Sequence, residues 1–230
     1  MSVRTIRFRQ PSLVKPWVRK TMAVWRALKD GGFLGKIMIY PAIGVDCLPL
    51  AAGARVLGVN WYDYKRADIM EHVDPILSRQ LASRLKTMIN YGELTYRSNL
   101  DTCNTQELKA VLRPFRSTSP KSLVLKHYFE YAFLKEWDME TERYYDVPWS
   151  DAMIKARRWT ANMLKWLRPG DTVVAFDPVF YKILKEQAGD LKEVHTGFSR
   201  RENRTDVIYE CGVPVISLPD YAWVFRRISS

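Results

Sequence analysis

Two short apolar runs, residues 37–40 and 55–59, are each followed by small and polar residues suited to ligand contact. Gly44 can adopt positive φ at little cost, and beside the small side chain of Ala42 it lets a ligand approach the backbone. The candidate ligand contacts are the residues at and after the ends of the two runs: Tyr40, Pro41, Ala42, Gly44, Asp46, Asn60 and Asp63. An apolar run, a small-residue turn, a short apolar segment and a second run are how many α/β proteins build a nucleotide site.

Later runs end in further candidates. His127 is the candidate general base, because an unperturbed imidazole has a pKa near neutrality, although a lone histidine at a strand end also suits a structural role. Tyr128, the second candidate catalytic residue, can stack on a ring or pack in the core. Asn99 and Leu100 are candidate ligand contacts, and Asn99, like the neighbouring Asp101, equally suits a turn or a helix cap.

Strands that end at one edge of a sheet would bring these residues together. Period and length predict strands at residues 37–40, 55–59, 93–101, 121–129 and 172–176, with later candidates at 191–199, 213–217 and 221–228. Helices are predicted between them, with Asp74, Asn104, Ser150 and Asp177 as caps. The alternation predicts an α/β, Rossmann-like, doubly wound sheet of about seven strands, mostly parallel, with helices on both faces.

The 230 residues predict one domain with an appendage. Residues 1–33 form a basic lead-in in which Val18, Met22, Trp25 and Leu28 recur at helical spacing before Gly31-Gly32. We expect this helix to pack on a Rossmann-like domain at residues 34–230.

Composition excludes several classes of protein. Hydrophobic residues make up 47% of the chain and charged residues 27%, which is typical of a globular protein, and no apolar run is long enough to span a membrane. The N-terminus lacks the apolar centre of a secretion signal, so we expect a cytoplasmic protein. Three scattered cysteines (Cys47, Cys103, Cys211) and three histidines make a zinc site unexpected and favour reduced structural thiols.

A formal net charge of +11 favours an anionic partner, with nucleic acid, a phosphorylated substrate and a membrane surface as alternatives. Proteins of similar basic pI that bind no nucleic acid also occur, so the charge alone does not decide whether nucleic acid is the partner. The candidate contacts are cations interleaved with two tryptophans on the predicted helix 151–167, and an arginine cluster: Lys155, Arg157, Arg158, Trp159, Lys165, Trp166, Arg200, Arg201 and Arg204. They suit phosphate contact with base stacking, or simply the solvated face of a helix.

Three stretches resemble the class I methyltransferases that use S-adenosylmethionine, whose core is a seven-stranded sheet with a reversed last strand. They are "KIMIYPAIGVDCLPLAAGARVLGVNWYD" (36–63), "MLKWLRPGDTVVAFDP" (163–178) and the aromatic, basic "YAWVFRRI" (221–228). The resemblance covers the order of elements over residues 34–228 rather than a dense run of identities. It implies S-adenosylmethionine as cofactor and transfer of a methyl group to an unidentified acceptor.

The sequence departs from the family at two positions. A GxGxG-type turn after an acidic residue is usual, whereas residues 40–46 contain one glycine, Gly44. The family binds ribose hydroxyls with an acid at the end of the second strand, where Asn60 stands, and Asp46 suits either the methionine amino group or a helix cap. A non-catalytic Rossmann-like protein that acts through its basic surface is therefore the alternative.

A third interpretation rests on "VVAFDPVFY", which resembles the Asp-Pro-Pro-Tyr motif of DNA adenine methyltransferases. The segment Asp177-Pro178-Val179-Phe180-Tyr181 lacks the second proline, and its tyrosine lies one position too late. In the ordinary assignment Asp177 and Pro178 begin a helix. A DNA adenine methyltransferase-like enzyme that flips its target base is the alternative that this segment would support.

Overall fold

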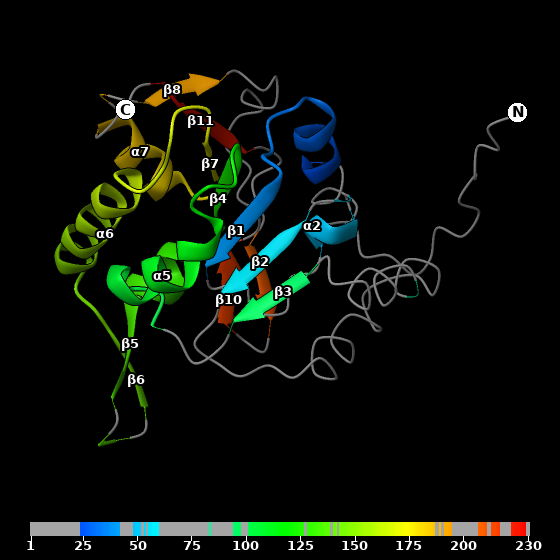
Figure 1. Ribbon diagram of the computed structural model, residues 1–230. Coiled ribbons are helices and arrows are strands. Elements are labelled where there is room, and N and C mark those ends of the chain that lie inside the picture. The colour runs from blue at the N-terminus through cyan, green and yellow to red at the C-terminus, as the bar shows by residue number, and fades with distance from the viewer. Residues whose placement is uncertain are drawn as a thin grey trace, which may run out of the picture.

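The computed structural model of the protein describes residues 24–41, 48–51, 53, 55–59, 83, 94–97, 101–126, 128–138, 140–141, 143–186, 189, 191–194, 207–210, 213–216 and 222–228. A seven-stranded sheet in the order β3-β2-β1-β4-β7-β11-β8 forms its centre (Figure 1). Its strands are β1 (Ile37–Pro41), β2 (Val56–Val59), β3 (Leu94–Arg97), β4 (Lys121–Leu125), β7 (Thr172–Ala175), β8 (Leu191–Val194) and β11 (Trp223–Arg227).

The strand directions confirm the predicted sheet. Strands β3, β2, β1, β4 and β7 pair in parallel, and β11 runs antiparallel to both of its neighbours, β7 and β8. The sheet is thus mostly parallel, and its last strand in sequence is the reversed one, as the resemblance implied. β4 ends at Leu125, before the end of the run predicted at 121–129.

Helices cover both faces of the sheet, which explains why the first strands are continuous apolar runs. The helices α5 (Thr105–Leu112), α6 (Trp149–Leu164) and α7 (Pro178–Glu186) lie on one side (Figure 1). They share a core with the strand residues that point to that face, Ile37, Ile39, Leu57, Val59, Leu123, Leu125, Val173 and Ala175. A short helix, α2 (Leu48–Ala51), follows β1.

A helix at residues 24–30 packs on the domain, as predicted for the lead-in segment. Trp25 and Leu28 are fully buried, and the Trp25 ring lies 4.7 Å from that of Phe176, centroid to centroid. The helix ends at a turn in which Gly32 has φ +67°, a conformation that favours glycine. Val18 and Met22 lie outside the described residues, and the boundary at residue 33 stays a prediction.

Two of the three described helix caps agree with the sequence. The side chain of Asn104 accepts hydrogen bonds from the backbone of Gln106 and Glu107, at 3.1 and 3.5 Å, and that of Asp177 from Val179 at 2.7 Å. Ser150 is wrong as the cap of α6. This helix begins at Trp149, because the carbonyl of Pro148 already accepts the first two amides, those of Asp151 and Ala152.

Two hairpins lie outside the main sheet. A π-helical turn, η2 (Glu130–Leu134), leads into β5 (Lys135–Asp138) and β6 (Arg143–Asp146), which project from the body (Figure 1). The second hairpin pairs β9 (Val207–Glu210) with β10 (Val213–Ile216), so the strand predicted at 213–217 exists but belongs to a separate sheet. No helix among the described residues is both long and apolar enough to cross a lipid bilayer.

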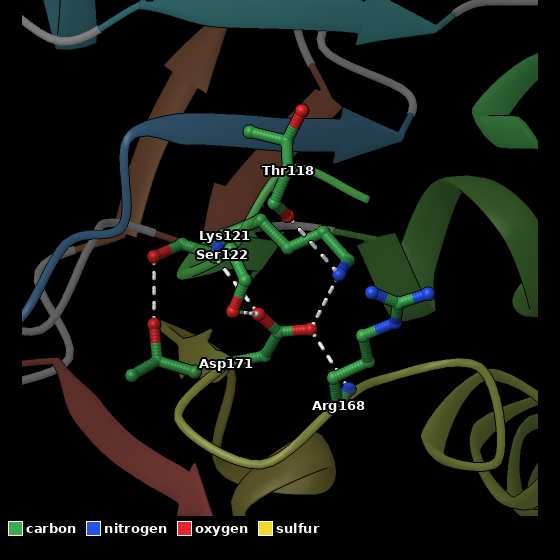
Figure 2. A network of polar contacts seen from close by, with 7 residues as sticks. Thr118, Lys121, Ser122, Arg168 and Asp171 are labelled. Atoms are coloured by element: carbon green, nitrogen blue, oxygen red, sulfur yellow. Dashed lines mark hydrogen bonds and ion pairs between the residues drawn. The ribbon is translucent and has the colours of Figure 1, made fainter. Parts of the chain in front are cut away.

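A buried ion pair ties β4 to the turn before β7 (Figure 2). Lys121 Nζ lies 2.6 Å from Asp171 Oδ2, and both side chains are fully buried. The turn has Pro169 at its second position and Gly170, with φ +88°, at its third, which is the geometry of a type II turn. The amino ends of the strands are therefore held by polar contacts, opposite the edge where ligands bind in such folds.

Candidate functional site

The connections of the sheet locate one crevice. From β1 the chain winds outward to β2 and β3, whereas β4, the other neighbour of β1, leads to β7 on the opposite side. Ligands of open α/β sheets bind outside the carboxyl ends of the strands at such a switch point. We therefore expect the ligand crevice where β1 ends, at Tyr40 and Pro41, and where β4 ends, before Lys126.

The strand register ends β1, β2 and β3, which precede most of the predicted ligand contacts, at one level. Pro41 is level with Val59, and Val59 is level with Arg97, so β1, β2 and β3 end together. Every predicted segment directly follows one of these strand ends or that of β4. Tyr40, Pro41 and Tyr128 are described, whereas the other predicted contacts lie outside the described residues: Ala42, Gly44, Asp46, Asn60, Asp63, Asn99, Leu100 and His127.

Tyr128 packs in the core below the crevice. Its side chain is fully buried, and its hydroxyl donates a 2.6 Å hydrogen bond to the backbone carbonyl of Thr102. Its ring lies 4.8 Å from Trp159 and 5.9 Å from Phe180, centroid to centroid. Burial raises the pKa of this phenol well above its ordinary value. These contacts favour the packing role of Tyr128 over a role in proton transfer.

Residues 101–104 form a fixed wall beside Tyr128. Asp101 Oδ1 accepts a 2.9 Å hydrogen bond from the amide of Cys103, and the carboxylate of Glu107 accepts from the amide of Asp101 and the side chain of Asn104. Asp101 and Asn104 thus take the turn and cap roles that the sequence allowed. The carbonyl of Thr102 accepts from Tyr128 and from the indole of Trp159, at 2.9 Å. Nothing in the pattern around Thr102 indicated this double role.

Cys103 carries a partly buried thiol in the same wall. Its Sγ donates to the carbonyl of Ala132, 2.8 Å away. Burial, and then the negative charge and hydrogen bond of Asp101, raise the pKa of this thiol from 9.0 to about 12. A thiol with such a pKa is protonated at neutral pH and is a poor nucleophile. Cys103 is therefore structural, as expected for the cysteines.

We expect Cys103 to resist alkylation in the folded protein. At pH 8 the rate with iodoacetamide should be at least about 100-fold lower than in urea, because the thiolate fraction falls with the raised pKa and partial burial restricts access. Peptide mass spectrometry separates Cys103 from Cys47 and Cys211. Because folding raises the pKa of Cys103, its protonated thiol contributes to the free energy of unfolding below about pH 9. This contribution declines as the pH rises toward 12. Rapid labelling in the folded state would contradict this placement.

The segment that resembles a DNA adenine methyltransferase motif begins a helix and enters the core. Asp177 caps α7, and Phe180 is fully buried among aromatic rings. Tyr181 stacks on Trp223, with ring centroids 4.5 Å apart. These contacts favour the ordinary assignment of Asp177 and Pro178 as a helix start.

The prediction that Trp159 and Trp166 form a stacking surface along α6 is wrong. Trp159 and Trp166 are 2% and 8% exposed, so neither ring is available to a base. Lys155 pairs with Glu136, and Arg157 pairs with Glu186 at 2.8 Å, so two of the cations are neutralised within the chain. Arg200, Arg201 and Arg204 lie outside the described residues.

Comparison with known proteins gives similarities of fold. No model of a protein family matches the sequence, and no curated protein is significantly similar to it. A putative methyltransferase from Thermobifida fusca has a TM-score of 0.48 and 12% identity, over 93% of this chain and 81% of that one. The N-methyltransferase NodS from Bradyrhizobium japonicum, in complex with S-adenosyl-L-homocysteine, has a TM-score of 0.44 and 12% identity, over 93% of this chain and 88% of that one.

A third similar structure is the magnesium protoporphyrin IX methyltransferase of Synechocystis with bound SAM, which has a TM-score of 0.42 and 13% identity. The match covers 93% of this chain and 79% of that one. The chain's own strand order, with β11 reversed between β7 and β8, is what defines its fold. It is the doubly wound, Rossmann-like sheet that the resemblance to class I methyltransferases predicted.

Proposed function

We propose that the protein is an S-adenosylmethionine-dependent methyltransferase. One observation carries the proposal: the sheet has seven strands and its last strand is reversed, as the sequence resemblance implied. Because the register ends β1, β2 and β3 at one level, it supports a single cofactor site. That site would be formed by the segments that begin at Ala42, Asn60 and Asn99.

The residues at this edge suit the parts of the cofactor. The turn with Ala42 and Gly44 lets the adenosyl group approach the backbone, Asn60 hydrogen-bonds the ribose, and Asp46 accepts from the methionine amino group. When bound, the cofactor supplies a sulfonium methyl group that an acceptor nucleophile attacks in line, while the sulfur keeps the electrons of the broken bond.

The chain's own contribution to the reaction is alignment and exclusion of water. The buried ends of β1 and β4 and the wall of Asp101, Thr102 and Cys103 hold the crevice in one shape. His127, which follows β4 directly, is our proposed base for acceptors that must lose a proton.

Ligand-dependent melting tests the proposal. At cofactor concentrations about 100-fold above Kd the folded state should gain about 2.7 kcal/mol, which raises Tm by several degrees for a chain of this size. Gly44→Val should weaken binding at least about tenfold, because a branched side chain fills the space beside the backbone and disfavours positive φ. Gly189→Val is the matched control, since Gly189 is exposed and a Cβ there meets nothing within 4 Å.

Two outcomes would count against the proposal. Absence of a Tm shift with both S-adenosylmethionine and S-adenosylhomocysteine would favour the non-catalytic alternative. A Gly44→Val variant that keeps full affinity would instead move the cofactor turn elsewhere in the chain.

A further inference from the structure

A basic cleft lies away from the proposed cofactor site. It has a volume of about 410 Å³ and is lined by residues of α5, of the 3-10 turn η1 (Arg113–Phe115) and of the turn after α6: Gln106, Lys109, Ala110, Arg113, Arg116 and Trp166. η1 leads to the amino end of β4, and the turn after α6 leads to the amino end of β7. The end of the cleft at η1 is therefore near the edge of the sheet opposite the crevice between β1 and β4.

Three cations form a row along this cleft. Lys109, Arg113 and Arg116 are spaced four and three residues apart, which puts them on one face of α5 and its η1 extension, about 5 to 6 Å apart along the axis. Arg113 and Arg116 are exposed, and Lys109 is partly exposed. Within the described part of the chain none of the three has an ion-pair partner.

Neighbouring charges do not neutralise the row. The carboxylate of Glu107, on the same helix, is engaged at the cap with Asp101 and Asn104. Two cations of α6 and α7 are paired instead, Lys155 with Glu136 and Lys185 with Glu193 at 3.0 Å. The cleft therefore concentrates positive charge that the fold leaves for an external anion.

Trp166 forms the apolar lining of the cleft. Its ring is 8% exposed, and Lys121 Nζ lies 4.8 Å from the ring centroid on the buried side. The ring is thus held by the ion pair of Lys121 with Asp171 and is not free to stack on a base. Recognition in the cleft consequently depends on charge and shape rather than on aromatic stacking.

We propose that Lys109, Arg113 and Arg116 bind successive phosphates of a nucleic-acid strand. A row of separate cations matches a chain of phosphodiesters, whereas an isolated phosphate would engage only one or two of them. The net charge of +11 adds long-range attraction for a polyanion. A cleft lined by a row of cations fits a strand better than it fits the plane of a membrane. The proposal does not depend on the cofactor site, because the cleft and the crevice share no residue.

Salt-dependent binding of a fluorescein-labelled single-stranded DNA of about 20 nucleotides tests this site. The test variant combines Lys109→Gln, Arg113→Gln and Arg116→Gln. The matched control combines Arg158→Gln, Lys182→Gln and Lys192→Gln, which are exposed cations outside the cleft and lower the net charge equally. Both variants should melt as the parent does, because none of the six side chains is buried.

The cleft variant should bind the oligonucleotide at least about tenfold more weakly at moderate salt. The plot of log K against log salt concentration should also be less steep by about 2 to 3, because each lost phosphate contact removes about 0.7 to 0.9 from the slope. The control should change neither quantity to that extent. Equal losses in both variants, or an affinity that does not change with salt, would overturn the proposal. It would also be overturned if the cleft variant lost binding to phosphatidylserine vesicles but not to the oligonucleotide. Cofactor-induced melting shifts should be unaffected in the cleft variant, which separates this proposal from the proposed function.

Discussion

Replacing Asp171 by alanine should lower the free energy of unfolding by about 3 to 5 kcal/mol, because it leaves a buried lysine without its counter-charge. Lys121 and Asp171 are each fully buried, and their charged atoms are 2.6 Å apart. A loss of this size is a large fraction of the 5 to 15 kcal/mol that is typical of a folded domain. We expect the variant to be largely unfolded at temperatures where the parent protein is folded.

The carboxylate of Asp171 has more hydrogen-bond partners than the ammonium group of Lys121. We therefore expect substitutions of Asp171 to destabilise the protein more than substitutions of Lys121. The oxygens of Asp171 also accept hydrogen bonds from the amides of Lys121 and Arg168, at 3.0 and 2.8 Å (Figure 2). The hydroxyl of Ser119 donates to the same carboxylate at 3.3 Å. Asp171→Ala leaves these donors unsatisfied, at about 1 to 3 kcal/mol for each one that stays buried. Lys121→Met leaves them bonded and should therefore destabilise the fold less.

Urea unfolding followed by circular dichroism measures these differences. Asp151→Ala is the matched control, because Asp151 is exposed in the first turn of α6 and contributes about 0.3 to 1 kcal/mol through the helix dipole. The double variant Lys121→Met, Asp171→Asn should lose less free energy of unfolding than the sum of the losses of the single variants Lys121→Met and Asp171→Asn. In the double variant neither partner is left charged. Equal stability of Asp171→Ala and Asp151→Ala would mean that the ion pair is not buried in solution.

The sequence predicts strands well where both faces of the strand are buried. β1 and β7 lie between helix layers, so every residue of each strand is buried and the strand reads as a continuous apolar run. The hairpin of β5 and β6 gives no such signal. All four residues of β6 are exposed, and charged side chains occur along both strands. Pairing across a short turn holds this hairpin, and a search for apolar periodicity therefore misses it.

Side-chain environment is less predictable than secondary structure. Lys121 and Asp171 are residue types that normally lie at the surface, and they are 50 positions apart in the chain. They meet only because β4 and β7 pair with Ser122 level with Thr172. The sequence pattern assigns Trp159 to a basic face of the helix. Trp159 follows the buried Ala156 by three residues, so the two side chains are only about 60° apart around the helix axis. The wide apolar stripe of a packed helix includes it.

The candidate site follows the same division. The edge of the sheet could be predicted, because it depends on which runs are strands and on the rule for parallel crossovers. The roles of side chains there depend on contacts between distant segments. Tyr128 is one case, since its hydroxyl is occupied by the carbonyl of Thr102, 26 residues away in the chain.

Phe180→Ala should destabilise the protein by about 3 to 5 kcal/mol, the range for removing a buried phenylalanine. The Phe180 ring is fully buried, with its centroid 5.9 Å from that of Tyr128 and 6.2 Å from those of Phe129, Phe133 and Trp159. Edge-to-face and offset arrangements of this kind add to the area that the ring buries. Because these rings lie beneath the end of β4, the cavity would also loosen the wall of the crevice.

This substitution also separates two interpretations of the segment around Asp177. If Phe180 packs in the core, Phe180→Ala lowers the urea midpoint strongly, and Phe180→Leu, which keeps most of the volume, lowers it much less. Ile154→Ala is the exposed control, since Ile154 is 57% exposed, and should change stability by less than about 0.5 kcal/mol. If the segment instead gripped a flipped base, Phe180→Ala would leave stability near that of the parent and weaken DNA binding. A stable Phe180→Ala variant with impaired DNA binding would therefore restore the adenine methyltransferase alternative.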